Sequence, residues 1–139
     1  MRSTAVDHNR RLGRDFFEAQ DRLRGGPDPV LVTPGYTAVL GGNPPMPLAG
    51  HAGFAQGFYA GFPDARHDID QVIATDDRVV VRLAIKATHT GSLFGIPPTG
   101  KVVSVTTHVI MHVEDGRVAR LFGLFDEAGM LRQMGVLAG

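Results

Sequence analysis

The carboxyl group of Asp126 has the sequence surroundings of a group that transfers protons. It directly follows the apolar segment Leu121-Phe122-Gly123-Leu124-Phe125, whereas most other acidic residues fall in predicted helices or turns. An apolar environment disfavours the charged form of a carboxyl group, which suits it to general acid or base catalysis. The alternative is that Asp126 caps the helix predicted to follow it, a common role for Asp.

Arg82 is a second charged residue inside an apolar pattern, here the predicted strand of residues 78–88. A buried guanidinium group needs a carboxylate or several carbonyl groups as partners, so Asp126 or Asp64 is expected to pair with it. The alternative is a solvated Arg82 on an open face of the sheet.

Two histidines lie four residues apart on the predicted strand of residues 101–113. The strand rise separates His108 from His112 by about 13 Å, too far for both to bind one metal ion. We therefore predict no metal site and no cofactor. His108 is expected to orient a substrate carbonyl or to pair with Asp126, although a lone histidine on a strand is more often a satisfied core residue.

The composition limits the class of protein. A chain of 139 residues has the size of one domain with one core, so residues 1–139 are predicted to form a single domain. Its 14 basic residues balance its 14 acidic ones, which argues against a nucleic-acid partner. Cysteine is absent, which excludes disulfides and thiolate sites and fits a cytoplasmic protein. No apolar run reaches the roughly 18 residues that a membrane span needs.

Hydrophobic periodicity predicts the elements that position these residues. Helical spacing predicts helices over residues 3–24, 51–62 and 126–134 and a helical turn within 28–32, whereas residues 36–40 read as irregular or weakly extended. From residue 66 the period changes to two and predicts strands near 67–74, 78–88, 101–113 and 117–125. Helices followed by strands indicate an α+β fold with one antiparallel sheet. The loop of residues 91–100 is apolar enough to fold back over another part of the chain.

Several motifs of the second half occur in the order seen in one known family. They are Phe62-Pro63-Asp64, residues 76–82, Thr88-His89-Thr90-Gly91, Pro97-Pro98-Thr99-Gly100, Glu114-Asp115-Gly116-Arg117-Val118 and residues 122–126. With them the chain resembles the SnoaL-like polyketide cyclases of the nuclear transport factor 2-like superfamily. The resemblance implies a cone-shaped fold in which N-terminal helices cover a curved antiparallel sheet around an apolar pocket. Two departures are Phe122, where the family usually has Trp, and residues 36–40, which lack a histidine often found there.

The resemblance also implies where the chemistry lies. Asp126 matches the family's catalytic aspartate, and superfamily enzymes place their polar groups on the sheet face that lines the pocket. We therefore assign the mixed face of the strands to the pocket, and the uniformly apolar face, with Val79, Val81, Leu83 and Ile85, to a homodimer interface. The expected catalytic residues are Asp126, His108 and Arg82, and the expected substrate contacts are Tyr36, Phe54, Phe58, Ile110 and Phe122.

Three functions fit these expectations. The first is a cofactor-independent cyclase or isomerase in which Asp126 moves a proton α to a carbonyl of a polyketide-like compound. The second is an epoxide hydrolase-like enzyme, which needs a second pocket carboxylate, although Ala84 stands beside Arg82 on the same face. The third is a non-catalytic module that binds an apolar small molecule.

Overall fold

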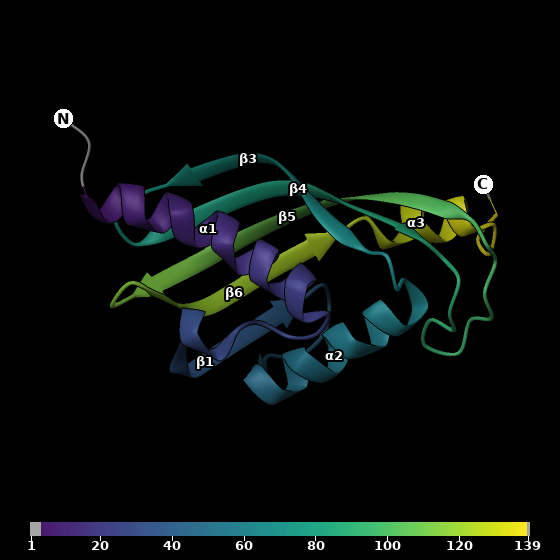
Figure 1. Cartoon of the computed structure of the whole chain (residues 1–139), viewed down its shortest axis with the longest axis horizontal. Helices are drawn as coiled ribbons and strands as arrows, with labels where there is room; N and C mark the ends of the chain where they lie inside the picture. Colours follow the sequence, from purple (N-terminus) through teal and green to yellow (C-terminus); the bar gives the residue numbers. More distant parts are fainter. Residues whose placement is uncertain (1–3, 139) are drawn as a thin grey trace.

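The structure, a computed structural model, describes residues 4–138, and its order of elements agrees with the predicted α+β class (Figure 1). Each predicted helix and strand is present within a few residues of its predicted ends. Ser3, the first residue of the predicted helix 3–24, lies outside the described residues. The elements are α1 Thr4–Leu23, a 3₁₀ turn Pro29–Leu31, β1 Val32–Leu40, β2 Met46–Pro47, α2 Leu48–Gly61, β3 Arg66–Ala74, β4 Arg78–Thr88, β5 Val102–Glu114, β6 Arg117–Phe125 and α3 Glu127–Met134.

The six strands form one curved, open sheet in the order β2-β1-β6-β5-β4-β3. Strands β3 to β6 are antiparallel neighbours, as predicted, but β1 pairs with β6 in parallel, so the sheet is mixed and not wholly antiparallel. Residues 36–40, predicted to be irregular or weakly extended, are extended and belong to β1. Their partners in β6 lie about 80 residues away, with Ala38 opposite Leu121 and Leu40 opposite Gly123, and local sequence carries no signal of such pairing.

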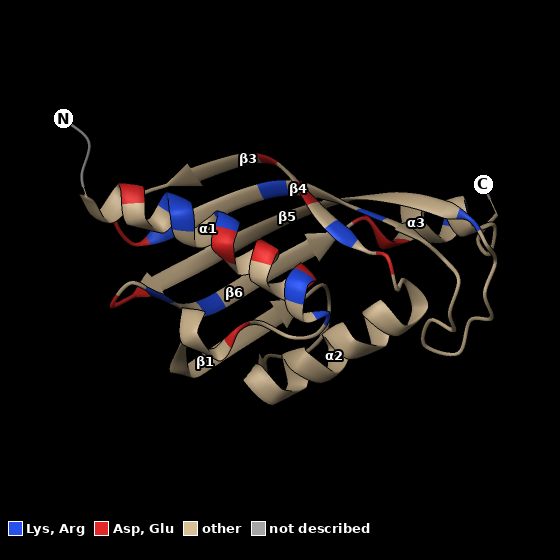
Figure 2. Ribbon diagram, viewed as in Figure 1, with Lys and Arg blue, Asp and Glu red and all other residues tan. Residues whose placement is uncertain are grey.

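Helices α1 and α2 cover one face of this sheet (Figure 1). Helix α1 approaches β4 so closely that a Cβ atom on Gly13 would lie 2.8 Å from Val79 Cγ1. The start of the helix is tied to the β3–β4 turn, because the Asn9 side-chain amide donates to the carbonyl oxygens of Thr75 and Asp76 at 3.0 and 2.9 Å. The charged residues of the helical layer are on α1, and α2 carries none (Figure 2).

The apolar row of β4 lies beneath these helices. Val79 and Val81 are fully buried and Leu83 is 2% exposed, so the row belongs to the core of the chain itself. Its assignment to a dimer interface is therefore wrong. Alternation along a strand separates two faces, and the apolar one is buried here because the apolar sides of α1 and α2 need a partner.

The loop of residues 91–100 folds back onto the C-terminal end of α2. The backbone N–H of Gly91 donates to the carbonyl oxygen of Gly61 at 3.1 Å, and a Cβ atom on Gly91 would lie only 1.9 Å from the carbonyl oxygen of Ala60. The ring of Phe94 packs on Phe54 of α2, with 5.5 Å between ring centroids. The loop therefore covers one end of the helix that lines the cavity described below.

Over residues 4–138, none of the helices has both the length and the apolar character needed to cross a membrane.

Candidate functional site

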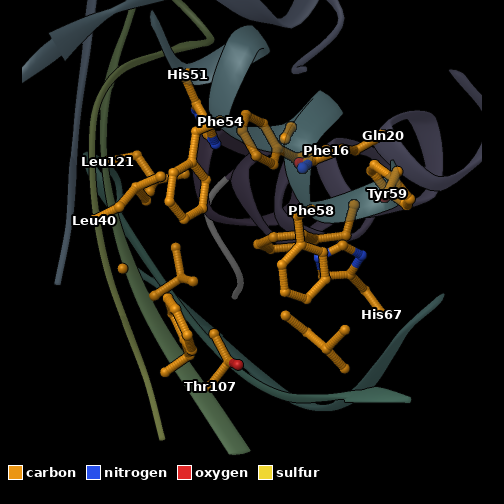
Figure 3. Close-up of a pocket in the computed structure, with 16 residues that line it drawn as sticks. Phe16, Gln20, Leu40, His51, Phe54, Phe58, Tyr59, His67, Thr107 and Leu121 are labelled. Atoms are coloured by element: carbon orange, nitrogen blue, oxygen red, sulfur yellow. The ribbon is translucent and has the colours of Figure 1, made fainter. Parts of the chain in front are cut away.

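An apolar cavity of about 80 Å³ lies between the two covering helices and the sheet (Figure 3). Its aromatic lining comes from α1, α2 and the end of β6, and its aliphatic lining comes from α2 and four strands. These residues are Phe16, Phe17, Phe54, Phe58 and Phe125, with Leu40, Ala55, Ile85, Val109 and Leu121. Five side chains with polar atoms interrupt the apolar wall, namely Gln20, His51, Tyr59, His67 and Thr107.

The cavity lies on the uniformly apolar face of the sheet, so the assignment of the mixed face to the pocket is wrong. Ile85, Thr107 and Val109 line it from β4 and β5, whereas the side chains between them point outward. The mixed composition of the outward face is that of a solvent-exposed surface. Alternation separated the faces correctly, and the side on which the helices pack decided which became the pocket wall.

Asp21, at the C-terminal end of α1, binds two residues of the cavity wall. Its Oδ1 lies 2.6 Å from His67 Nδ1 and accepts a hydrogen bond from the Tyr59 hydroxyl at 2.7 Å. Its Oδ2 accepts a hydrogen bond from the backbone N–H of His67 at 2.7 Å. The His67 side chain is only 7% exposed, and its ring stacks on Phe17 with 5.0 Å between centroids. One hydrogen bond and a ring contact therefore orient the His67 imidazole at the wall of the cavity, and two further hydrogen bonds fix the carboxylate that it contacts.

The surroundings keep Asp21 ionised. Burial raises the pKa of its carboxyl group, but the hydrogen bond and the charge of His67, together with the Tyr59 and backbone hydrogen bonds, outweigh burial, so the pKa lies below its ordinary value. The Tyr59 hydroxyl keeps its proton, because burial and then the hydrogen bond to Asp21 raise the pKa of Tyr59. Asp21 is thus an ionised carboxylate that accepts hydrogen bonds from Tyr59 and His67.

A second imidazole, His51 of α2, reaches the cavity from another side. Its Nδ1 lies 2.9 Å from the hydroxyl oxygen of Tyr36 on β1, and both residues are buried. Burial, and secondarily the positive charge that His67 carries when protonated, lower the pKa of His51 to about 4, while burial raises the pKa of Tyr36. His51 is therefore neutral at pH 7, and it lines the same cavity as His67.

Comparison with known proteins shows where this fold and cavity belong. The sequence profile of the SnoaL-like polyketide cyclases matches residues 33–134. The chain belongs to the SnoaL-like polyketide cyclase family. None of the curated protein sequences matches it significantly.

Solved structures of other SnoaL-like and related proteins share the whole fold. A protein from Jannaschia sp. CCS1 assigned as a SnoaL-like polyketide cyclase superposes with a TM-score of 0.84 at 22% identity, over 99% of each chain. IdmH from Streptomyces antibioticus, assigned as a polyketide cyclase, gives 0.75 at 26% identity, over 96% of this chain and 100% of its own. AclR from Streptomyces galilaeus, assigned as a hydroxylase, gives 0.84 at 22%, over 96% and 89%. One scaffold thus carries different assigned activities, and the residues of the cavity have to decide the chemistry.

The structure places two of the predicted substrate contacts, Phe54 and Phe58, in the cavity wall of this SnoaL-like chain. Tyr36 lies one layer further out, behind His51. Ile110 and Phe122 point to the opposite face of the sheet and are 44% and 37% exposed.

The three predicted catalytic residues lie outside the cavity lining. Arg82 is exposed on the outward face and pairs with Asp70 instead of Asp126 or Asp64. His108 is exposed on the same face. Asp126 is the N-cap of α3, where its Oδ1 accepts the backbone N–H of Gly129 at 2.9 Å. The capping alternative for Asp126 is therefore present in the structure, and its catalytic role stays a prediction.

Asp21, His51 and His67 were not predicted as site residues. Asp21 and His67 are 46 positions apart, on a helix and on a strand, so no local spacing connects them. The available signal was the position of Asp21, four residues after Phe17 and therefore on the same side of α1 as that buried ring. Within residues 4–138, no group of three or more His, Asp or Glu side chains is arranged to hold a metal ion, and independence from metal stays a prediction.

Proposed function

We propose that this SnoaL-like protein is a cofactor-independent enzyme that moves a proton α to a carbonyl group inside the cavity, with His67 as the acid/base group. The observation that carries the proposal is the 2.6 Å contact between Asp21 Oδ1 and His67 Nδ1 at the wall of an apolar cavity. Cyclisation and isomerisation of polyketide-like compounds both begin with such a proton transfer.

The orientation of His67 supplies the base. In the neutral form of His67, the Asp21 carboxylate accepts the N–H at Nδ1, so Nε2 presents a lone pair. When Nε2 takes a proton from the substrate, the charge of Asp21 stabilises the resulting imidazolium. The same imidazolium then returns the proton, either to another carbon or to the alkoxide formed in an aldol closure.

His51 supplies the group that stabilises the enolate. A Tyr36 hydroxyl that donates to Nδ1 leaves the second nitrogen, Nε2, as a donor toward the cavity. A neutral imidazole N–H that donates to the substrate carbonyl oxygen stabilises the negative charge that develops there. The surrounding phenylalanine rings exclude water, which strengthens both interactions.

The epoxide hydrolase-like alternative has less support. It requires an arginine and two carboxylates around an attacking water, but Arg82 is on the outward face, and no arginine is among the described residues that line the cavity.

The proposal predicts that replacement of His67 by Gln lowers catalysed α-proton exchange by about 100-fold or more, because the base is removed. Exchange is measured by NMR as deuterium entry from D₂O into the methyl group of acetophenone and of 4-hydroxyacetophenone. Asp126→Asn is the matched control, since Asn still caps α3 but cannot transfer a proton. If the parent protein exchanges the proton no faster than buffer does, the non-catalytic binding module is favoured. If only Asp126→Asn loses exchange, Asp126 and not His67 is the acid/base group.

We also propose a homodimer, now through the outward face of the sheet. Leu124 and Ile110 are 68% and 44% exposed there, and β-pairing makes them part of one patch with Val80 and Phe122. The nearby Arg82–Asp70 pair balances its own charge, so two copies of this face would meet without net repulsion.

Light scattering at micromolar concentration is expected to give twice the 14.9 kDa chain mass, and Leu124→Asp combined with Ile110→Asp should give the monomer, because each introduced carboxylate would be buried without a partner. A parent protein that stays monomeric, or a double variant that stays dimeric, would contradict the proposed interface.

A further inference from the structure

The side-chain carbonyl of Gln20 is a buried hydrogen-bond acceptor that no group of the described chain satisfies. Gln20 is 7% exposed, and its Oε1 is fully buried with no hydrogen-bond partner among residues 4–138. Buried polar atoms are nearly always paired, so an acceptor left open in a folded protein calls for a partner from outside the chain. Figure 3 shows the Gln20 side chain reaching from α1 toward the other lining residues.

The position of this amide ties it to the proposed reaction. Gln20 is the residue before Asp21, and four residues after Phe16, whose ring also lines the cavity. The open acceptor and the Asp21–His67 pair therefore reach the same cavity from consecutive positions of one helix. A ligand placed for proton transfer at His67 lies within the same small space as Gln20.

We infer that Gln20 Oε1 accepts a hydrogen bond from a hydroxyl group of the substrate, and that the cavity takes a single ring that bears this hydroxyl together with a carbonyl group. The carbonyl part rests on the proposed function. The hydroxyl part rests on the open acceptor alone. The substrate class is thus a phenol-like or enol-like ring ketone.

The size of the cavity limits what enters it. An apolar cavity of about 150 Å³ takes up benzene, and the volume here is about 80 Å³. Because the cavity is smaller than that, a single ring fills it and extends in part through its open side. A substrate with several fused rings would keep its remaining rings outside. The phenylalanine-rich wall suits the faces of such a ring, and the open amide oxygen suits its one polar edge.

A comparison of two probes tests the inference. Calorimetric titration of the parent protein is expected to show 4-hydroxyacetophenone bound about 10- to 100-fold more tightly than acetophenone, because the compound without a hydroxyl leaves Oε1 unpaired. Gln20→Met, which keeps the length of the side chain but has no amide, should remove this preference and bind both probes with similar affinity. The matched control is Gln56→Met on the exposed side of α2, which should keep it.

Equal affinity of the parent protein for the two probes, or weak binding of both at millimolar concentration, would overturn the inference without any variant. A preference that survives in Gln20→Met would do the same, with a melting curve to show that the variant is folded. The outcome is separable from that of the proposed function. A hydroxyl preference without α-proton exchange defeats only the catalytic proposal, and exchange without the preference defeats only the role of Gln20.

Discussion

Replacing Asp21 by Asn is expected to lower catalysed α-proton exchange by roughly 1,000- to 10,000-fold, the size of effect that the same change has beside the histidine of a serine protease. The amide nearly matches the carboxylate in shape. If the new amide oxygen keeps the hydrogen bond from the backbone N–H of His67, its NH₂ group turns toward His67 Nδ1, and the proton of the neutral imidazole then moves to Nε2. The nitrogen that should accept the substrate proton becomes a donor.

Tyr59→Phe is the control for this change, because it removes one donor to Asp21 but leaves the contact with His67 Nδ1. We expect it to lower exchange by no more than about 10-fold. The measurement is the NMR rate of deuterium entry into acetophenone, with probe affinity determined separately by calorimetry. An Asp21→Asn protein that exchanges at close to the parent rate would show that the carboxylate does not orient the base.

The second large effect is on stability, and it depends on pH through His51. The pKa of His51 in the folded protein is about 4, below its ordinary value of 6.5, because of burial and then the charge of His67. As the pH falls, His51 therefore binds a proton near pH 6.5 in the unfolded chain but only near pH 4 in the folded protein. The stabilising effect is complete above pH 6.5 and is lost as the pH falls toward 4, by about 3 kcal/mol in the free energy of unfolding.

Urea titrations at several pH values between 7 and 4 measure this loss, and His51→Gln isolates it. The Gln side chain can still accept a hydrogen bond from the Tyr36 hydroxyl but does not titrate in this range. The variant should be less stable than the parent protein at pH 7, since the stacking of His51 on Tyr36 is lost, and should lose less stability than the parent on acidification. Parallel curves for the two proteins would mean that His51 is not held neutral by burial.

The site could be predicted from the sequence only in part. Phe54 and Phe58 were expected among the substrate contacts, and they line the cavity. Arg82 and His108 were assigned to it by analogy and lie on the other face. The alternation along β4 and β5 was interpreted correctly, but an alternating strand has two faces, and its own residues do not state which one the helices will cover.

The sequence by itself determined the features that depend on neighbouring residues. Strands over 78–88 and 117–125 begin and end where the period-two pattern does, the α+β class follows from the order of the elements, and the family follows from motifs along the second half. Tertiary structure alone decided the parallel pairing of β1 with β6, the buried face of the sheet, and the contact of Asp21 with His67 across 46 residues. Periodicity reports local backbone geometry. These contacts depend instead on how whole helices and strands bury their apolar faces against one another, and the free energy of that packing cannot be assigned to any single residue.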